Sequence, residues 1–286
     1  MIQLSPLVLS RRDRRRKIKD YATRVLLLLA ASVVIFPLLA VLFYIIRRAW
    51  PGLSWAFFVQ VPKPVGEPGG GMANGIFGSL KMLGLASLFG IPWGVGAGLY
   101  LSEYHLSRWA RWISFFCNLL ASTPSIVVGV FIYGIFVVPM KTFSAYAGAA
   151  SLALIMIPII ARSSEEILRL VPNSVREAGL ALGISRWRVT LFVVLRGARG
   201  GIVTGVILAL ARVAGETAPL LFTALNNSFW SRGLGEPTAS LPVQIYTYAI
   251  SPFESWQQQA WVGAFVLVMM SLILNLSTRL MLRQKK

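Results

Sequence analysis

The sequence predicts an all-α membrane protein that crosses the bilayer six times, and three observations carry this prediction. Of its 286 residues, 56% are hydrophobic and only 13% are charged, and the mean hydropathy is +0.68. A soluble domain carries about a quarter charged residues. The apolar residues gather in six separate runs, and the segments between the runs hold most of the Lys and Arg. Together these features indicate a polytopic membrane protein.

The six apolar runs are close to the roughly 20 residues that an α-helix needs to cross the hydrocarbon core. In chain order they are 25–46, 76–99, 113–138, 145–161, 201–224 and 260–280. The first run is too long for the apolar part of a signal peptide, and Arg47-Arg48-Ala-Trp-Pro is a poor cleavage site. We therefore expect all six runs to be membrane spans.

The chain is predicted to have two parts. Residues 1–24 form a basic tail suited to contact with anionic lipid. Residues 25–286 form a six-helix transmembrane domain, interrupted by one long polar segment at 162–200. The Pro/Gly-rich stretch at 50–74 contains three consecutive glycines, but no Lys-Ser/Thr follows them as in a phosphate-binding loop. That stretch is expected to be a flexible loop.

The distribution of basic residues predicts the orientation of the chain. Lys and Arg number 28 against 10 Asp and Glu, which gives a formal net charge of +18. In a soluble protein this excess would suggest nucleic acid as a partner. Here most of the basic residues lie in the N-terminal tail, the 162–200 segment and the C-terminal end. The positive-inside rule then places both termini and the 162–200 segment in the cytoplasm, and no nucleic-acid partner is expected.

Several kinds of chemistry lack the residues they require. Cys117 is the single cysteine and His105 the single histidine, so an internal disulfide is impossible and neither a metal site nor a cofactor is expected. A lone histidine between two spans is a poor base for an intramembrane nucleophile. The sequence has no Gly-x4-Gly-Lys-Ser/Thr, so it cannot cradle ATP in a P-loop. We predict a chain that is not an enzyme, with a receptor or scaffold remaining as an alternative to a transporter.

The 162–200 segment carries signals for two short helices. Ser174-Val-Arg-Glu177 fits a capping box, in which serine and glutamate bond each other's backbone N–H groups. Gly183 suits the residue after a helix end, where the backbone turns left-handed. Ser185 is placed to cap a second helix that begins at Arg186. The segment is therefore predicted to form helix, turn and helix outside the membrane.

The third predicted span contains the polar sequence Ser122-Thr123-Pro124-Ser125. A proline at membrane depth frees one backbone carbonyl, which is tolerated where neighbouring helices or a water-lined cavity satisfy it. The three hydroxyl side chains of this stretch are therefore candidate residues of a polar pathway.

The fifth predicted span carries a charge at mid-membrane. Arg212 lies about halfway along the run, and Glu216 and Thr217 follow one turn later. A charge at the bilayer centre costs about 3 kcal/mol on insertion scales, so it should face protein or water. With a spacing of i and i+4 on one helix, Arg212 and Glu216 are predicted to pair. Either the pair only locks the bundle, or Arg212 binds a passing oxyanion through two hydrogen bonds while Glu216 holds it in place.

A resemblance to a known family rests on the 162–200 segment. Glu177-Ala178-Gly179, then Gly183, then Val193-Val-Leu195 resemble the EAA loop of the permease subunits of ABC importers, Glu-Ala-Ala-x3-Gly-x9-Ile-x-Leu-Pro. The spacing matches throughout, Gly179 replaces the second Ala, and Arg196 stands where the family has Pro. The resemblance implies the type I ABC-importer permease fold, in which this loop docks on a cytoplasmic ATP-binding subunit.

A second resemblance points to the substrate. The stretch Arg-Val-Ala-Gly-Glu-Thr-Ala-Pro-Leu-Leu-Phe at 212–222 resembles the matching helix of one of the two permease subunits of phosphate ABC importers, and segments at 99–104, 124–129 and 237–246 support it. The resemblance implies import of inorganic phosphate, with a second permease subunit, ATP-binding subunits and an extracytoplasmic phosphate-binding protein as partners. Sulfate or molybdate remains as an alternative oxyanion.

Overall fold

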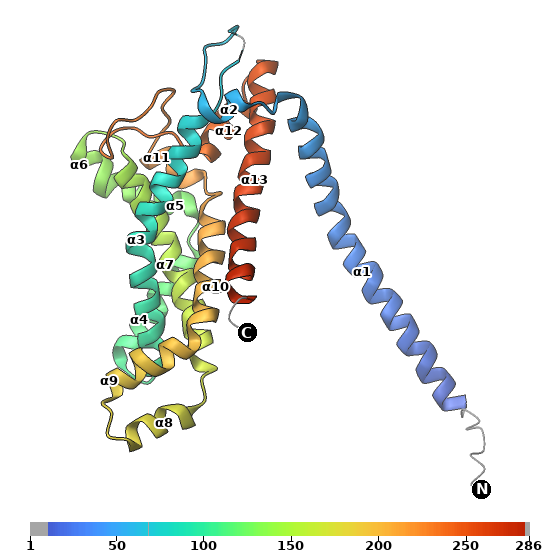
Figure 1. Cartoon of the computed structure of the whole chain (residues 1–286), viewed down its shortest axis with the longest axis vertical. Coiled ribbons are helices and arrows are strands. Elements are labelled where there is room, and N and C mark those ends of the chain that lie inside the picture. Colours follow the sequence, from blue (N-terminus) through green and yellow to red (C-terminus); the bar gives the residue numbers. More distant parts are fainter. Residues whose placement is uncertain (1–10, 68, 284–286) are drawn as a thin grey trace. The chain divides into compact units, whose positions relative to one another are not determined.

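The computed structural model describes residues 11–67 and 69–283, and Figure 1 follows the chain from blue to red. The described residues form helices, turns and loops, with no β-strand among them. The chain divides into two compact units, Met1–Arg48 and Ala49–Lys286. The predicted all-α fold is confirmed.

The first unit is dominated by α1 (Arg11–Ala49), a helix of 39 residues with Pro37 inside it. None of the residues in its most apolar stretch is buried in this chain. The predicted first span, 25–46, lies within this helix. The predicted basic tail is helical from Arg11 onward, and residues 1–10 lie outside the described part.

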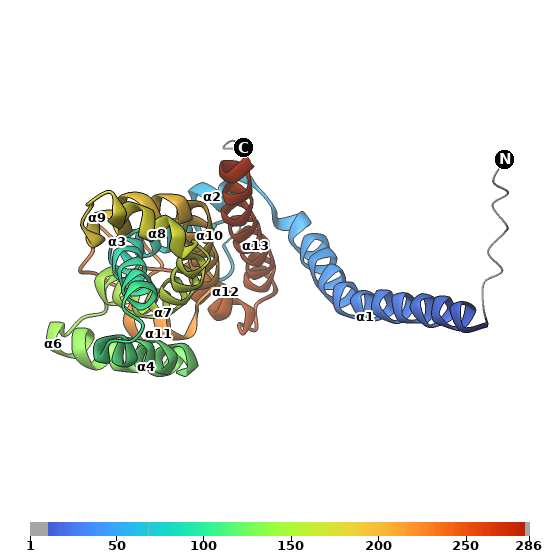
Figure 2. The ribbon, with the colours of Figure 1, turned by 90° about the horizontal axis from the view of Figure 1, so that it is seen from below.

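The second unit holds the remaining helices, which Figures 1 and 2 show from two directions. In chain order they are α2 (Trp55–Val59), α3 (Ala73–Glu103), α4 (Arg108–Ser122), α5 (Ser125–Ile132), α6 (Val138–Met140), α7 (Ala145–Arg169), α8 (Asn173–Ala181), α9 (Arg186–Val189), α10 (Leu195–Val213), α11 (Ala218–Thr223), α12 (Leu241–Ala249) and α13 (Glu254–Arg283). A 3₁₀ turn at Trp50–Gly52 precedes α2. Two π-helical segments, η2 (Tyr133–Val137) and η3 (Thr190–Val194), join α5 to α6 and α9 to α10.

Five helices of the described residues are long and apolar enough to cross a membrane, counting the continuous helix through α9, η3 and α10 as one. The stretch from α4 to α6 is long and apolar enough to be a sixth span only when its two halves are taken together. The two halves are bent by 106° at the break between them. The predicted span at 113–138 is therefore not one continuous helix, and it remains the sixth candidate only as a broken span. Pro124 disfavours helical backbone at the residue before it, and Thr123 is extended, with φ −74° and ψ 130°.

A row of small residues sets the packing of α3 on α7. Gly90, Gly94 and Gly98 recur every fourth residue of α3. A Cβ at Gly94 would lie 2.7 Å from Cβ of Ile160, and one at Gly98 would lie 2.6 Å from the carbonyl oxygen of Ala161. Without side chains at these positions, the two helix backbones approach closely, as membrane helices do when small residues line their interface.

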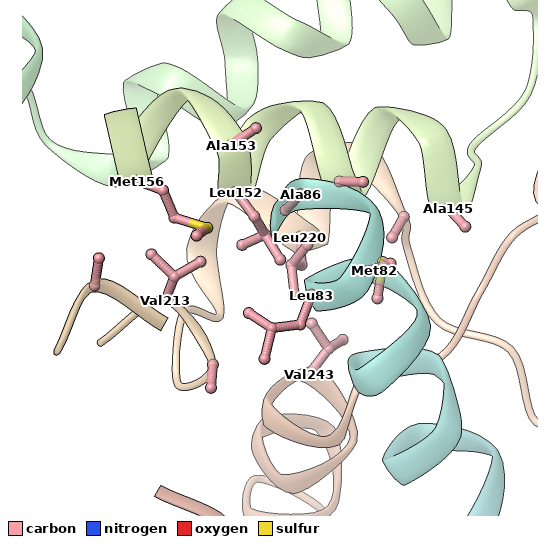
Figure 3. Close-up of a cluster of buried hydrophobic side chains, with 14 of the residues drawn as sticks. Met82, Leu83, Ala86, Ala145, Leu152, Ala153, Met156, Val213, Leu220 and Val243 are labelled. Carbon is pink, nitrogen blue, oxygen red and sulfur yellow. The ribbon is translucent and has the colours of Figure 1, made fainter. Parts of the chain in front are cut away.

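The main hydrophobic core joins helices that are far apart in the sequence. Figure 3 shows its buried side chains from α3, α7, α10, α11 and α12, among them Met82, Leu83, Leu152, Met156, Val213, Leu220 and Val243. Val213 ends α10 and Leu220 lies in α11, so both sides of the connection between these two helices are anchored in the core. That connection contains Glu216 and Thr217.

A buried polar cluster joins α12 to the start of α3. The side-chain amide of Gln244 donates to the side-chain oxygen of Asn74 at 3.0 Å, and the backbone N–H of Leu241 donates to Ser79 Oγ at 2.8 Å. Asn74 and Gln244 are 4% and 0% exposed. Bonds this well buried hold α12 firmly against α3.

Candidate functional site

The helix that carries Arg212 ends earlier than predicted. The apolar helix runs from Arg186 to Val213, so Arg212 lies in its last turn rather than halfway along a span at 201–224. Backbone turns end it: the N–H of Gly215 donates to the carbonyl of Arg212 at 3.3 Å, and the N–H of Glu216 donates to that of Val213 at 3.1 Å. The next helix, α11, begins after this turn, with a proline in its first two positions where the fixed φ is favourable.

The predicted Arg212–Glu216 ion pair is also wrong. Because the helix ends between them, the two side chains do not share a helix face. Arg212 is exposed, and Glu216 and Thr217 are partly exposed. Across residues 11–67 and 69–283, no ion pair or side-chain hydrogen bond involves Arg212 or Glu216. A clamp made by this pair is therefore not what holds the bundle, and the guanidinium is available to a group outside the chain.

The break between α4 and α5 uses most of its polar groups internally. The hydroxyls of Ser122 and Thr123 both donate to the carbonyl of Leu119, at 3.0 and 2.7 Å. The same carbonyl also accepts the backbone N–H of Thr123 at 3.0 Å, so three donors of this turn meet at one acceptor. Ser125 is the first residue of α5 and is partly exposed. Two of the three predicted pathway hydroxyls thus serve the backbone of their own helix.

The helices that follow the two breaks pack together. A Cβ at Gly129 of α5 would lie only 2.6 Å from Cα of Pro219 in α11. The hydroxyl of Thr223 donates to the carbonyl of Pro219 at 2.8 Å, which closes the short α11 helix. The structure therefore brings together the elements that carry the two sets of predicted pathway residues, although no hydrogen bond among the described residues joins Arg212 to the hydroxyls of the α4–α5 break.

The 162–200 segment contains the predicted first helix and turn, in α8 and its connection to α9, whereas α9 is not a separate short helix but the first turn of the continuous helix Arg186–Val213. Gly183 has φ +75°, the left-handed conformation predicted for it. Its N–H donates to the carbonyl of Leu180 at 2.9 Å, and the N–H of Ile184 donates to that of Gly179 at 3.2 Å. These two bonds form a Schellman motif, which fixes the direction in which the chain leaves α8.

The predicted capping box does not form. Pro172 occupies the N-cap position of α8 with φ −57° and ψ 143°, and no side chain caps the helix. The helix therefore starts two residues earlier than predicted, which places Ser174 inside its first turn. Ser174, Glu177 and Ala178 are all exposed. Ser185 does precede α9 as predicted, but its side chain makes no capping bond.

Packing explains why Gly179 stands where the EAA motif has its second alanine. Gly179 is buried, and a Cβ at this position would lie 2.7 Å from Cγ2 of Val189 in α9. Glycine thus allows α8 and α9 to pack more closely than the alanine typical of the motif. The turn and this contact make the pair a compact unit.

Glu103, at the end of α3, anchors this pair, a role that was not predicted from the sequence. Its carboxylate lies 2.9 Å from Nε of Arg176, and only 7% of the residue is exposed. The remaining guanidinium nitrogens of Arg176 donate to the carbonyls of Val171 and Leu168, at 2.6 and 3.0 Å. Arg186 of α9 donates to the backbone carbonyl of Glu103 at 2.8 Å. One residue of α3 therefore fixes both short helices.

A second polar cluster joins α4 to the end of α7. Arg162, predicted to begin the polar segment, lies inside α7 and pairs with Glu165 at 2.7 Å. It also donates to Ser114 Oγ and to the side-chain oxygen of Asn118, both at 2.7 Å. Glu165 pairs in addition with Arg169 at 2.7 Å. These bonds connect the first half of the broken span to the helix that leads into α8.

Exposed apolar side chains mark the outer face of α8, α9 and their connection. Leu182 is 79% exposed, Trp187 is 54% exposed and Leu180 is 47% exposed. Exposed apolar groups gathered on a segment of this kind mark a surface that contacts protein or membrane. No group of three His, Cys, Asp or Glu side chains within the described ranges could hold a metal ion.

Comparison with known proteins identifies the family. Residues 90–284 match the family described as binding-protein-dependent transport system inner membrane component. A Yersinia pestis protein named phosphate transport system permease protein PstA is 42% identical over 279 residues, covering 96% of this chain and 95% of its own length. A Haemophilus influenzae protein of the same name is 47% identical over 258 residues, covering 89% of this chain and 91% of the relative. The chain belongs to the PstA permease family.

Solved structures show the same fold as this PstA-family chain. A chain of the inward-facing MetNI methionine ABC transporter matches with a TM-score of 0.62 and 21% identity, covering 74% of this chain and 94% of its own. A chain of a bacterial ABC transporter involved in alginate import matches with a TM-score of 0.65 and 13% identity, covering 96% of this chain and 98% of its own. The type I importer permease fold is therefore confirmed, and the chain is a multi-pass membrane protein.

Proposed function

We propose that this PstA-family chain is one permease subunit of an ATP-driven importer that carries inorganic phosphate across the inner membrane into the cytoplasm. The observation that carries the proposal is 42–47% identity, over most of the chain, to relatives named phosphate transport system permeases. Import of sulfate or molybdate is the alternative with the most similar chemistry, because both are tetrahedral oxyanions.

The deciding experiment is uptake of labelled phosphate by cells that lack this gene, with and without the gene restored. We expect uptake to return with the gene and to be reduced by excess unlabelled phosphate, but not by sulfate or molybdate. If sulfate or molybdate reduces uptake instead, that oxyanion and not phosphate is the substrate. Restored cells with no uptake of any of the three would contradict the transport proposal.

The energy for transport is proposed to come from partner subunits. The apolar side chains of α8 and α9 are exposed, and Glu103 and the turn at Gly183 hold both helices in place. Such a pre-formed surface suits docking to a cytoplasmic ATP-binding subunit, where ATP hydrolysis would occur. A second permease subunit and an extracytoplasmic phosphate-binding protein complete the proposed assembly.

Gly183→Val tests the docking role. Valine at a φ of +75° is strained by about 1–2 kcal/mol, so the turn should reorient while the membrane helices insert normally. We expect ATP hydrolysis by the assembled importer to continue with phosphate uptake reduced. Gly197→Val is the matched control, because a Cβ there meets nothing within 4 Å and its φ is not positive. Normal uptake by the Gly183→Val variant would contradict the docking role.

Both termini are proposed to lie in the cytoplasm. In a Cys117→Ser background, a cysteine replacing the exposed Ser185 should react with an impermeant thiol reagent only after the membrane is opened. A cysteine replacing Ser228, which is exposed on the opposite side of the predicted topology, should react in intact spheroplasts. The reverse pattern would invert the topology and remove the docking surface from the cytoplasm.

Arg212 is proposed to contact phosphate during transport, with Glu216, Thr217 and Ser125 beside the route. A guanidinium can bind a tetrahedral oxyanion through two parallel hydrogen bonds. The support for this role is that Arg212 is exposed at a helix end within an apolar bundle and has no ionic partner in the described part of the chain. Ser122 and Thr123 are proposed to contribute less to the route, because their hydroxyls already donate to the carbonyl of Leu119.

A further inference from the structure

Two adjoining pockets lie beside the 162–200 segment, away from the α10–α11 connection. One has a volume of about 260 Å³ and is lined by residues at the ends of α3 and α7 and the starts of α8 and α9. The other has a volume of about 210 Å³ and extends toward α4. His105 and Arg169 line both, so the pockets share one wall. We call the two together the basic pocket.

The arginines of the basic pocket divide into committed and available groups. Arg176 is committed, since all of its guanidinium nitrogens bond Glu103 or backbone carbonyls. Arg169 is available, since only one of its nitrogens donates, to Glu165, and its side chain is 55% exposed. Arg186 is available as a donor, since it uses a single nitrogen on the carbonyl of Glu103, and its guanidinium lies over the ring of Tyr104 at 5.0 Å.

Arg111 adds a third available cation on the α4 side. It is exposed and makes no side-chain hydrogen bond or ion pair with any residue in the described ranges. The two carboxylates of the pocket, Glu103 and Glu165, are each already engaged by arginine. The positive charge of Arg111 and Arg186 therefore has no carboxylate within the pocket to balance it.

One hydroxyl beside the larger pocket is unsatisfied. Ser102 lines this pocket, and its Oγ is buried with no hydrogen-bond partner among the described residues. Buried polar atoms nearly always have a partner, in protein or in bound molecules. Ser102 and His105 offer hydrogen bonds beside the guanidinium groups, which is the combination that binds phosphate oxygens.

We infer that the basic pocket binds a phosphate group, either inorganic phosphate or the headgroup of an anionic lipid. Arg169 belongs to α7 and Arg186 to α9, so a phosphate group bound between them would tie α9 to the membrane bundle. Occupancy would then stiffen the surface formed by α8 and α9. Binding of a phosphate group does not depend on the proposed transport function. Any effect of this binding on ATP-driven transport does rest on the proposed function.

The test uses the full-length chain, purified in neutral detergent and stripped of lipid. Binding of labelled inorganic phosphate is measured by equilibrium dialysis, and binding of added phosphatidylglycerol by native mass spectrometry, with phosphatidylcholine as the neutral comparison. The variants are Arg111→Ala, which breaks no bond seen in the structure, and Arg111→Ala combined with Arg169→Ala. Arg199→Ala is the matched control, because Arg199 is exposed in the same segment but lies outside the pocket.

We expect the double variant to weaken binding of one ligand by about tenfold or more, as loss of charge-assisted hydrogen bonds implies, and Arg199→Ala to leave it unchanged. Loss in the phosphate arm identifies a site for inorganic phosphate, and loss in the phosphatidylglycerol arm identifies a lipid site. Arg212→Gln should keep this binding whether or not Arg212 takes part in transport. If neither ligand responds to the pocket variants, or if phosphate binding is lost only with Arg212→Gln, the inference is wrong.

Discussion

Two membrane segments of this chain are broken near a proline, and the two breaks treat their polar groups differently. At the break between α4 and α5, the hydroxyls of Ser122 and Thr123 both bond one carbonyl of the preceding turn. At the break between α10 and α11, backbone turns end the helix, and Arg212 has no ionic partner in the part of the chain that the structure describes. The hydroxyls of the first break are bonded within their own helix, whereas the second break leaves the guanidinium of Arg212 exposed.

The chemistry of the side chains explains the difference. A serine or threonine hydroxyl can donate to a carbonyl three or four residues earlier in the same helix. A guanidinium has five N–H donors in a rigid plane and needs acceptors from elsewhere. Both breaks are flanked by buried residues, Val128 after the first and Val213 and Leu220 around the second. Each break is therefore held in a fixed geometry, but only the second leaves a guanidinium without an acceptor among the described residues.

The largest effect is expected from Arg212→Lys. Lysine keeps the charge but loses the planar fork, so bidentate contact with phosphate is lost. Loss of a charge-assisted hydrogen bond worth about 1.5–3 kcal/mol should lower uptake about ten- to hundredfold. The measurement is the initial rate of phosphate uptake per unit of inserted protein.

Two controls sharpen this prediction. Arg199→Lys, near the other end of the same helix, should leave uptake unchanged. Glu216→Gln should have a smaller effect than Arg212→Lys, because the two side chains do not pair in this chain. Full uptake by the Arg212→Lys variant would show that any cation suffices at this position. The second break would then, like the first, make no specific contact with phosphate.

A smaller effect is expected from Gly129→Ala, which probes the contact between the two breaks. The added Cβ would lie 2.6 Å from Cα of Pro219, so α5 and α11 must separate. Overpacking of this kind costs about 1–3 kcal/mol, and the melting temperature of the purified chain should fall by several degrees. Gly134→Ala is the control, since a Cβ there meets nothing within 4 Å. Equal melting temperatures for the two variants would mean that the contact between Gly129 and Pro219 does not couple the two breaks.

The same comparison shows what could be predicted from the sequence. Long apolar runs predicted five of the spanning helices and the location of the sixth, broken span, because hydropathy is a property of continuous stretches. The breaks were missed because hydropathy continues across them. Arg212 and Glu216 at i and i+4 suggested one helix, although Gly215 between them and Pro219 soon after were signals of a helix end.

Contacts between residues that lie far apart in the chain could not be predicted from the sequence either, whereas some local features could. Gly183 was predicted correctly, because a left-handed turn depends on local backbone chemistry. Glu103 was missed, because its partner Arg176 lies 73 residues further along the chain and no local pattern marks the pair. The capping box failed for a local reason, namely that Pro172 is the N-cap of α8, two residues before Ser174.

The smallest effect is expected from Ser122→Ala combined with Thr123→Val at the first break. Both hydroxyls donate to Leu119, so their removal leaves one carbonyl at the end of α4 without these bonds. Because the backbone N–H of Thr123 still donates to that carbonyl at 3.0 Å, the loss of stability should be only about 0.5–1.5 kcal/mol per hydroxyl.

Phosphate uptake per unit of inserted protein should then stay within about twofold of normal, a change of less than half a kcal/mol in the transport barrier. The matched change Ser125→Ala removes the one hydroxyl of this break that makes no hydrogen bond to another described residue. If Ser125→Ala lowers uptake while the double variant does not, Ser125 alone joins Arg212 on the route. If the double variant abolishes uptake with the chain still folded and inserted, the hydroxyls of Ser122 and Thr123 act on phosphate as well, and the contrast between the two breaks fails.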